Sequence, residues 1–385
     1  MKDIYMDHAA TTPLHPEVLE EMNAVYQSEF GNPSSIHSFG RGARKIVDEA
    51  RETIAKNIGA NEKEIIFTSG GTEADNLALI GTALANQDRG KHIITTMHEH
   101  HAVLHAAHFL EGIGFNVTYL PVYKNGRVSV EDLANALTPE TVLVSVMSVN
   151  NETGIIQPIR AIGELLKSHR AFFHVDAVQS FNLMKTDVKK MGIDLLTISS
   201  HKINGPKGIG SLYVADHVNI NALQFGGEQE RKRRAGTENV AGIVGFQKAV
   251  ELSINTQEER ISQYTQFKTL FLDTLTNHNV NFTVNGNQKE SIPSIVNISF
   301  PGTNVETLLT NLDLNGIAAS SGSACTAGSI EPSHVLAAMY GNENERTTNS
   351  IRFSFGMGQS LEMIKDAAGR VAEIVNRLAG KKGSD

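Results

Sequence analysis

The chain has 385 residues, a formal net charge of −8 and one cysteine. Because a single hydrophobic core rarely grows beyond about 250–300 residues, this length predicts two domains. The negative charge argues against a general affinity for nucleic acid or for anionic membranes. One cysteine excludes an internal disulfide and a cysteine-rich zinc site. No apolar run reaches the about 20 residues that span a bilayer, and an acid interrupts the start where a signal peptide would be apolar. We therefore expect a cytoplasmic protein without membrane contact.

The first two thirds of the chain alternate short apolar runs with helical patterns. Strands are predicted at residues 64–69, 92–97, 116–122, 141–149 and 194–200. The last two runs are almost entirely β-branched and apolar, which is typical of strands buried on both faces. Residues 129–132 (SVED) form a capping-box pattern that opens a helix. These features predict the α/β class, with a mainly parallel sheet sandwiched by helices.

The pattern changes after about residue 253. A long polar-rich helix is predicted at residues 258–277. It is followed by predicted strands at 281–284, 294–300, 317–321 and 351–355, and by helices at 305–312, 334–339 and 361–378. Such segregation indicates a smaller α+β domain. We predict a large domain over residues 16–255 and a small domain built from residues 1–15 and 256–385, which carries a cysteine loop at about 320–332.

A glycine pair joins the first of these strands to a helix. Residues 68–73 read TSGGTE. Glycines let backbone amides approach an anion closely, and the start of a helix adds partial positive charge, so Gly71 and the Thr72 hydroxyl are candidate phosphate ligands. The same pattern also occurs in plain tight turns.

Two ionisable residues end other predicted strands. Asp176 lies in the segment 174–179 (HVDAVQ), and Lys202 lies in 199–208 (SSHKINGPKG). In an open α/β sheet, ligands bind at the carboxyl ends of the strands. A desolvated lysine there loses its proton and becomes an amine nucleophile. Taken alone, Asp176 is equally a solvated acid or a helix cap, and Lys202 a surface lysine. Together with the phosphate motif, they are what a Schiff-base cofactor with a pyridinium nitrogen requires.

Motifs spread over nearly the whole chain carry a family resemblance. They are residues 5–13 (YMDHAATTP), 31–35 (GNPSS), 99–100 (EH), 149–154 (VNNETG), the segment around Lys202, 234–237 (RAGT), 321–325 (SGSAC) and 351–354 (IRFS). In these the chain resembles the cysteine desulfurases of the NifS/IscS type, which are fold type I pyridoxal phosphate enzymes related to class V aminotransferases. Its cysteine segment resembles the group with a long SSGSAC loop. It does not resemble the SufS-like group, whose cysteine follows an Arg-x-Gly-His-His pattern.

The resemblance implies a pyridoxal 5′-phosphate site and a role for each matching residue. Lys202 would hold the cofactor as a Schiff base, and Asp176 would pair with the ring nitrogen. Gln179 would bind the phenolic oxygen of the ring, and His100 would stack on the ring and act as an acid/base. The remaining implied ligands are Gly71, Thr72, Ser199 and His201 on the phosphate, Thr237 from the other subunit of a homodimer, Asn151 on both cofactor and substrate, and Arg352 on the substrate carboxylate.

Cys325 lies among small polar residues, which suits an accessible thiol better than a small buried side chain. The resemblance implies that its thiolate takes the sulfur of L-cysteine, leaving L-alanine and a persulfide. An acceptor protein, either an iron–sulfur scaffold or a tRNA-thiolating enzyme, would then receive the sulfur. The alternatives are selenocysteine lysis and other pyridoxal phosphate-dependent β-elimination or transamination, which need no enzymatic thiol. A cofactor-bearing protein that mainly regulates a partner is a further alternative.

Two other clusters have simpler interpretations. The zinc-protease motif fails after His98, because its second histidine would fall at Ala102. His101 and His105 are one helical turn apart, yet we predict that the histidines of this cluster lie on the surface and bind no metal. The one metal contact considered is that of the Cys325 persulfide with an iron–sulfur cluster. The basic run at residues 231–234 is interpreted as a solvated loop, close enough to the predicted dimeric site to steer an anionic substrate.

Overall fold

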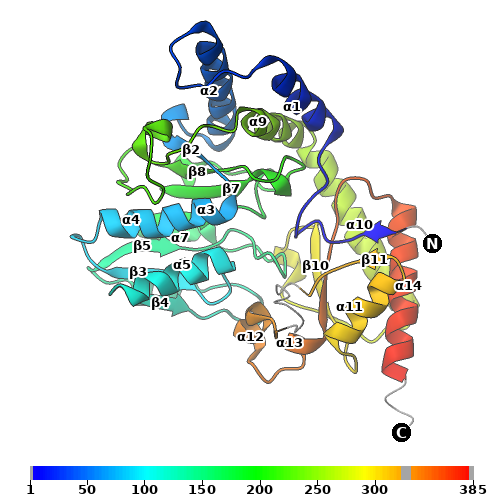
Figure 1. Cartoon of the computed structure of the whole chain (residues 1–385). Helices are drawn as coiled ribbons and strands as arrows, with labels where there is room; N and C mark the ends of the chain where they lie inside the picture. The colour runs from blue at the N-terminus through cyan, green and yellow to red at the C-terminus, as the bar shows by residue number, and fades with distance from the viewer. Residues whose placement is uncertain (1–2, 322–330, 381–385) are drawn as a thin grey trace.

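The computed structural model describes residues 3–321 and 331–380. Its main sheet has seven strands in the order β2-β8-β7-β6-β5-β3-β4 (Figure 1). They are β2 (Ile65–Thr68), β3 (His92–Thr96), β4 (Asn116–Leu120), β5 (Thr141–Ser145), β6 (Phe172–Asp176), β7 (Leu195–Ser199) and β8 (Gly210–Val214). Only β8 runs antiparallel to its neighbours β2 and β7, and the other pairs are parallel. The predicted, mainly parallel sheet is confirmed.

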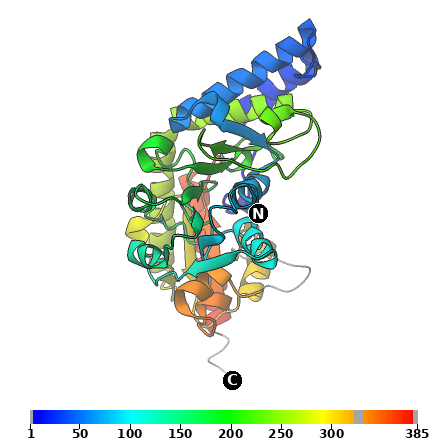
Figure 2. The ribbon, with the colours of Figure 1, turned by 90° about the vertical axis from the view of Figure 1, so that its left-hand side faces the viewer.

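Helices cover both faces of this sheet (Figure 2). The helices of this part of the chain are α1 (Pro16–Ser28), α2 (Ser38–Ile58), α3 (Gly71–Asn76), α4 (Thr82–Ala85), α5 (His101–Gly112), α6 (Val130–Ala136), α7 (Ile159–Leu166), α8 (Val188–Met191) and α9 (Val240–Asn255). Every residue of β5, β6, β7 and β8 is buried, as expected for strands covered on both sides. Ser129 caps α6 by accepting hydrogen bonds from the amides of Glu131 and Asp132, which confirms the predicted helix start.

The rest of the chain builds a smaller sheet and its covering helices. Strand β10 (Ile295–Ser299) pairs antiparallel with β12 (Ser350–Ser354) and β9 (Thr283–Val284). Strand β1 (Ile4–Tyr5) runs parallel to β11 (Ile317–Ala318), which brings the start of the chain beside its last third. The helices are α10 (Gln257–Asn277), α11 (Val305–Leu314), α12 (His334–Tyr340), α13 (Arg346–Asn349) and α14 (Leu361–Gly380).

Two large apolar clusters form the interior. One lies around the seven-stranded sheet, and the other lies between α10, α14 and the smaller sheet. The second cluster includes Ile4 and Met6 from the first residues, whereas Val335 and Leu336 of α12 pack into the first. The predicted domain division, residues 16–255 against 1–15 with 256–385, stays a prediction. Within the described ranges, no helix combines the length and apolar character needed to cross a bilayer.

Candidate active site

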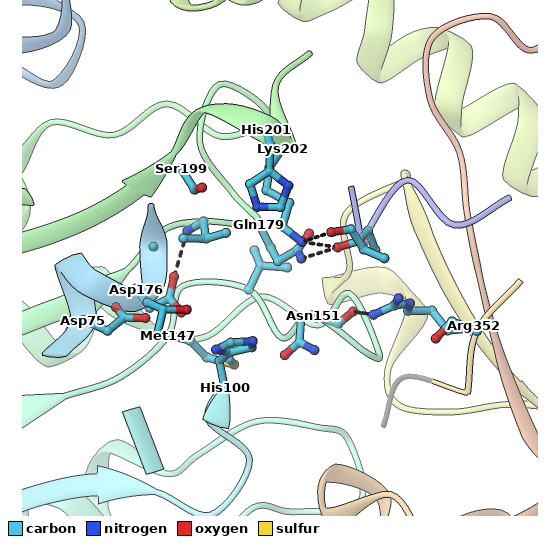
Figure 3. A pocket seen from close by; sticks show the side chains of 17 residues that line it. Asp75, His100, Met147, Asn151, Asp176, Gln179, Ser199, His201, Lys202 and Arg352 are labelled. Carbon is cyan, nitrogen blue, oxygen red and sulfur yellow. Dashed lines mark hydrogen bonds between the residues drawn. The ribbon is translucent and has the colours of Figure 1, made fainter. Parts of the chain in front are cut away.

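A cavity of about 350 Å³ opens at the carboxyl ends of β6 and β7 (Figure 3). It is lined by most of the predicted site residues, namely Gly71, Thr72, His100, Asn151, Asp176, Gln179, Ser199, His201, Lys202 and Arg352. The structure therefore brings together side chains from the whole length of the chain. Thr237 does not line the cavity and is exposed on the surface of this chain. Cys325 lies outside the described residues, but Ser320, just before that segment, lines the cavity.

One end of the cavity offers donors for an anion. Gly70 has a φ of 152°, a backbone region that favours glycine, and α3 starts directly after it. A Cβ added at Gly71 would lie only 3.0 Å from the side chain of Val178, so a larger residue there would require Val178 to shift. The Ser199 hydroxyl is buried and has no hydrogen-bond partner among the described residues. A free buried hydroxyl beside a helix start fits a phosphate ligand, as the sequence predicts.

Lys202 is held inside the cavity by backbone carbonyls. Its Nζ donates hydrogen bonds to the carbonyl of Ala10 at 2.8 Å and to that of Ala9. Desolvation and the positive charge of Arg352 lower the pKa of Lys202 to about 7. A substantial fraction is therefore an uncharged amine at neutral pH, which is the form that reacts with an aldehyde. Gln179 Nε2 donates to the same Ala9 carbonyl at 3.0 Å.

Asp176 ends β6 with its carboxyl group in the cavity. The side chain is buried, and Oδ1 accepts a hydrogen bond from the amide of Val178 at 2.9 Å. Burial raises the pKa of Asp176 to about 6, against the opposing effects of the Val178 amide and the Lys202 charge. A cationic ring nitrogen would stabilise this carboxylate as a counter-ion.

His100 caps the start of α5. Its Nδ1 accepts a hydrogen bond from the amide of Ala102 at 3.1 Å, which leaves the proton of the neutral ring on Nε2. Burial and the charge of Lys202 lower the pKa of His100 to about 4. The imidazole is therefore neutral at pH 7, ready to exchange a proton with a ligand.

Arg352, on β12, is fixed at the opposite side of the cavity. It forms an ion pair with Asp7 at 2.7 Å and donates to the carbonyl of Asn151 at 2.9 Å. Its Nε and the side-chain oxygen of Asn151 are buried without a hydrogen-bond partner in the described part of the chain. A planar guanidinium with unused donors suits a carboxylate ligand.

The basic run differs from its interpretation as a solvated loop. Arg231 and Lys232 are exposed, but Arg234 pairs with Glu73 of α3 at 2.7 Å. Glu230 forms a buried ion pair with Arg51 at 2.7 Å and accepts from the amide of Phe67. Glu230, Arg231 and Lys232 all have φ between 47° and 67°, a left-handed run that non-glycine residues rarely adopt. Buried contacts thus fix the segment that leads to Thr237.

The histidine cluster is also only partly on the surface. His98 is fully buried, so the prediction of a surface residue is wrong there, and its Nδ1 contacts the Thr96 hydroxyl at 2.7 Å. The rings of His101 and His105 stack 5.2 Å apart, and that of His334 lies 4.7 Å from His101. Among the residues that the structure describes, no three ligating side chains are arranged to hold a metal ion.

Several residues of the site escaped the sequence argument. Asp7 lies in the motif at residues 5–13, but no feature of the sequence pairs it with Arg352. The carbonyls of Ala9 and Ala10 are backbone groups that residue types do not reveal. Asp75 lines the cavity, but it lies in the polar sequence GTEADN of α3, where no feature of the sequence sets it apart.

A sheet with these strand-end residues defines a pyridoxal phosphate-dependent enzyme of fold type I. Residues 4–366 match the family model of the class V aminotransferases, so the chain belongs to that family, whose members use pyridoxal phosphate.

Known proteins match nearly the whole chain. A protein of Bacillus subtilis strain 168 named putative cysteine desulfurase IscS 1 is 59% identical over 378 residues, which is 98% of this chain and 100% of the relative. A cysteine desulfurase IscS of Clostridium botulinum is 50% identical over 94% of this chain and 92% of its own length. A solved NifS-like protein superposes with a TM-score of 0.91 at 34% identity, covering 98% and 100% of the two chains. The structure of SspA in complex with cysteine has a TM-score of 0.81 at 37% identity, covering 91% and 98%.

Proposed function

We propose that this chain is a cysteine desulfurase that converts L-cysteine to L-alanine and takes the sulfur onto Cys325. The observation that carries the proposal is the single cavity that gathers a lysine, a strand-end acid, an anion cradle and an arginine. Relatives that are 45–59% identical over nearly the whole chain and are named cysteine desulfurases support the same conclusion.

The cofactor fits the residues of the cavity. Lys202 would bind it covalently, Asp176 would pair with its ring nitrogen, and Gly71, Thr72, Ser199 and His201 would hold its phosphate. When bound, pyridoxal phosphate acts as an electron sink that stabilises negative charge at the Cα of an amino acid. Gln179 would donate to the phenolic oxygen of the ring in place of the Ala9 carbonyl to which it donates in this structure.

The other residues bind the substrate and move its proton and sulfur. Arg352 and Asn151 would hold the carboxylate of L-cysteine. Neutral His100 would exchange a proton with the bound substrate. The Cys325 thiolate attacks the substrate sulfur, so that an S–S bond forms while the Cβ–S bond breaks. Cβ then takes up a proton, and the products are L-alanine and a Cys325 persulfide.

The proposal is tested with the purified, pyridoxal phosphate-loaded chain and L-cysteine. Alanine should form together with protein-bound persulfide. Pyruvate and ammonia would instead indicate β-elimination, and a preference for selenocysteine would indicate a lyase. Neither alternative uses the one cysteine of the chain. The persulfide sulfur would pass to an acceptor protein in the cytoplasm, either an iron–sulfur scaffold or a tRNA-thiolating enzyme. Measuring the transfer of labelled sulfur to each candidate would distinguish the two acceptors.

Replacing Arg352 should weaken substrate binding more than chemistry. In Arg352→Gln, the KM for L-cysteine should rise about 10- to 100-fold, because a charge-assisted hydrogen bond is worth about 1.5–3 kcal/mol. Cysteamine lacks the carboxylate, so it should bind equally to both proteins and serves as the control. An unchanged KM for L-cysteine would remove Arg352 from the carboxylate site.

A homodimer is the proposed assembly, because apolar side chains beside the Thr237 segment are exposed. Phe30, Ile36 and Phe39 are 78%, 91% and 55% exposed, and the rings of Phe30 and Phe39 lie 5.0 Å apart. Arg44 of α2 pairs with Glu238 at 2.9 Å and so joins this patch to Thr237. Exposed apolar groups of this size are typical of a protein–protein interface. A second copy of the chain would cover them and receive Thr237 at its phosphate.

Mixing two inactive variants tests that arrangement. Lys202→Ala leaves Thr237 intact, and Thr237→Asp leaves Lys202 intact but would repel the phosphate of the partner site. In a mixed dimer, one site combines Lys202 with an unchanged Thr237, so activity should return to about a quarter of the wild-type rate under random exchange. Lys202→Ala mixed with Lys202→Ala/Thr237→Asp is the matched control and should stay inactive. No recovery despite subunit exchange shown by mass spectrometry would refute a shared site.

A further inference from the structure

A second buried acid lies beside Asp176 at the floor of the cavity (Figure 3). Asp75 projects from α3 and is 1% exposed, and Asp176 at the end of β6 is 6% exposed. The two carboxyl groups interact electrostatically, and both line the cavity. Two adjacent buried carboxyls cannot both ionise without a cation between them, so one of them retains a proton.

No positive charge among the described residues offsets a carboxylate at Asp75. The charged side chains that act on it are Asp176 and, more weakly, Glu99, which is itself buried. His174 Nε2 lies 3.7 Å from Asp75 Oδ1, but complete burial lowers the pKa of His174 to about 3 and keeps the ring neutral. Desolvation and Asp176 raise the pKa of Asp75 well above its ordinary value.

The hydrogen bonds also differ between the two acids. Asp176 has the Val178 amide at 2.9 Å and faces the charge of Lys202. Asp75 forms a hydrogen bond with the hydroxyl of Thr197. That hydroxyl also contacts His174 Nε2 at 3.0 Å, and it has only one proton to donate. Asp75 Oδ1 has no hydrogen-bond partner within the described residues. The ionised form is therefore better supported at Asp176 and the protonated form at Asp75.

We propose that Asp75 is a positioning residue that acts through Asp176: it keeps the proton of the buried pair, so that Asp176 is the carboxylate presented to the ring nitrogen of the cofactor. This inference rests on the proposed function. Protonated Asp75 adds no second negative charge behind the ring, and its hydroxyl is available to donate to Asp176. A cationic ring nitrogen would then offset the single negative charge of the pair.

The apoprotein gives a test that needs no cofactor. An acid with a raised pKa in the folded state retains a proton that the unfolded chain loses above about pH 3.9, so its contribution to stability falls as pH rises toward the folded pKa. Asp75→Asn removes that proton. Urea unfolding between pH 5 and 7 measures the unfolding constants of both proteins. For each pH unit, the ratio of the wild-type unfolding constant to that of Asp75→Asn should rise by up to tenfold. Asp88→Asn, at an exposed position, should retain the wild-type slope.

Pyridoxal phosphate titrated into the apoproteins then tests the positioning role. Asp75→Asn should bind it within about twofold of the wild type, because the amide mimics the neutral acid and retains a donor. Asp75→Ala should bind it about tenfold more weakly, through loss of one hydrogen bond to a charged group. Equal pH slopes for the wild type and Asp75→Asn, or unchanged affinity in Asp75→Ala, would overturn the inference. If Asp75→Ala does not fold, the affinity of Asp75→Asn decides instead. A more than tenfold loss of affinity in that variant would also overturn the inference. If the wild type binds no pyridoxal phosphate, the proposed function fails, while the pH slopes still decide which carboxyl holds the proton.

Discussion

Cys325→Ser should abolish alanine formation from L-cysteine while leaving cofactor binding unchanged. The serine hydroxyl is far less acidic than a thiol, whose pKa is about 8.5 in free cysteine, so it provides no comparable nucleophile toward sulfur at neutral pH. Cys325 lies outside the described residues, but the described residues on both sides of its segment contact residues that line the cavity or adjoin its lining. Ser320 pairs with Arg352, and Ser333 bonds the Glu152 carboxyl at 2.5 Å.

The measurement compares alanine release and protein-bound sulfur in the same samples. After exposure to L-cysteine without reductant, mass spectrometry of the wild type should show added sulfur on the peptide that contains Cys325. Ser329→Ala, four residues further along, is the matched control and should retain both signals. Slow pyruvate formation in Cys325→Ser is compatible with the proposal. Alanine formation at the wild-type rate in Cys325→Ser is not, because it would remove the thiol from the reaction.

The residues at the strand ends were predictable because buried strands have a recognisable sequence pattern. Continuous β-branched runs at residues 141–149 and 194–200 indicated parallel strands, and the polar residues that follow such strands meet at one edge of the sheet. Asp176 and Lys202 lie there, as predicted. The predicted strand at 281–284 is shorter in the structure, where only Thr283 and Val284 pair with β10. An edge strand takes its length from its partner, which local sequence does not specify.

Contacts between distant segments were not predictable. Asp7 and Arg352 are 345 residues apart and meet because β1 pairs with β11 and Asp7 bridges to Ser354 of β12. The Arg51–Glu230 pair looks like two surface charges in the sequence, yet it is buried and fixes three left-handed residues near Thr237. Such pairs depend on the complete fold, whereas strand and helix patterns depend on neighbouring residues. Sequence reasoning therefore located the chemical groups and missed the contacts that orient them.

Lys202→Ala should eliminate covalent attachment of pyridoxal phosphate and abolish alanine formation, because Lys202 is the one lysine among the residues that line the cavity. The phosphate cradle of Gly71, Thr72 and Ser199 remains, so the variant should still bind the cofactor without a covalent link. Borohydride reduction followed by peptide mass spectrometry measures attachment, and dialysis measures retention. Lys207→Ala, at an exposed position five residues further along, is the control and should retain both attachment and activity.

The pH dependence of attachment gives this prediction a sign. Only the uncharged amine reacts with an aldehyde, and the pKa of Lys202 is lowered to about 7 by desolvation and by the charge of Arg352. The rate at which the apoprotein attaches pyridoxal phosphate should therefore rise between pH 6 and 8, with a midpoint near 7. Removing the positive charge in Arg352→Gln should move that midpoint upward, because the protonated amine is then less disfavoured. A midpoint near pH 10, the ordinary range of lysine, would show that the cavity does not desolvate Lys202. Attachment at another lysine in Lys202→Ala, at the wild-type rate, would show that Lys202 is not the residue that binds the cofactor.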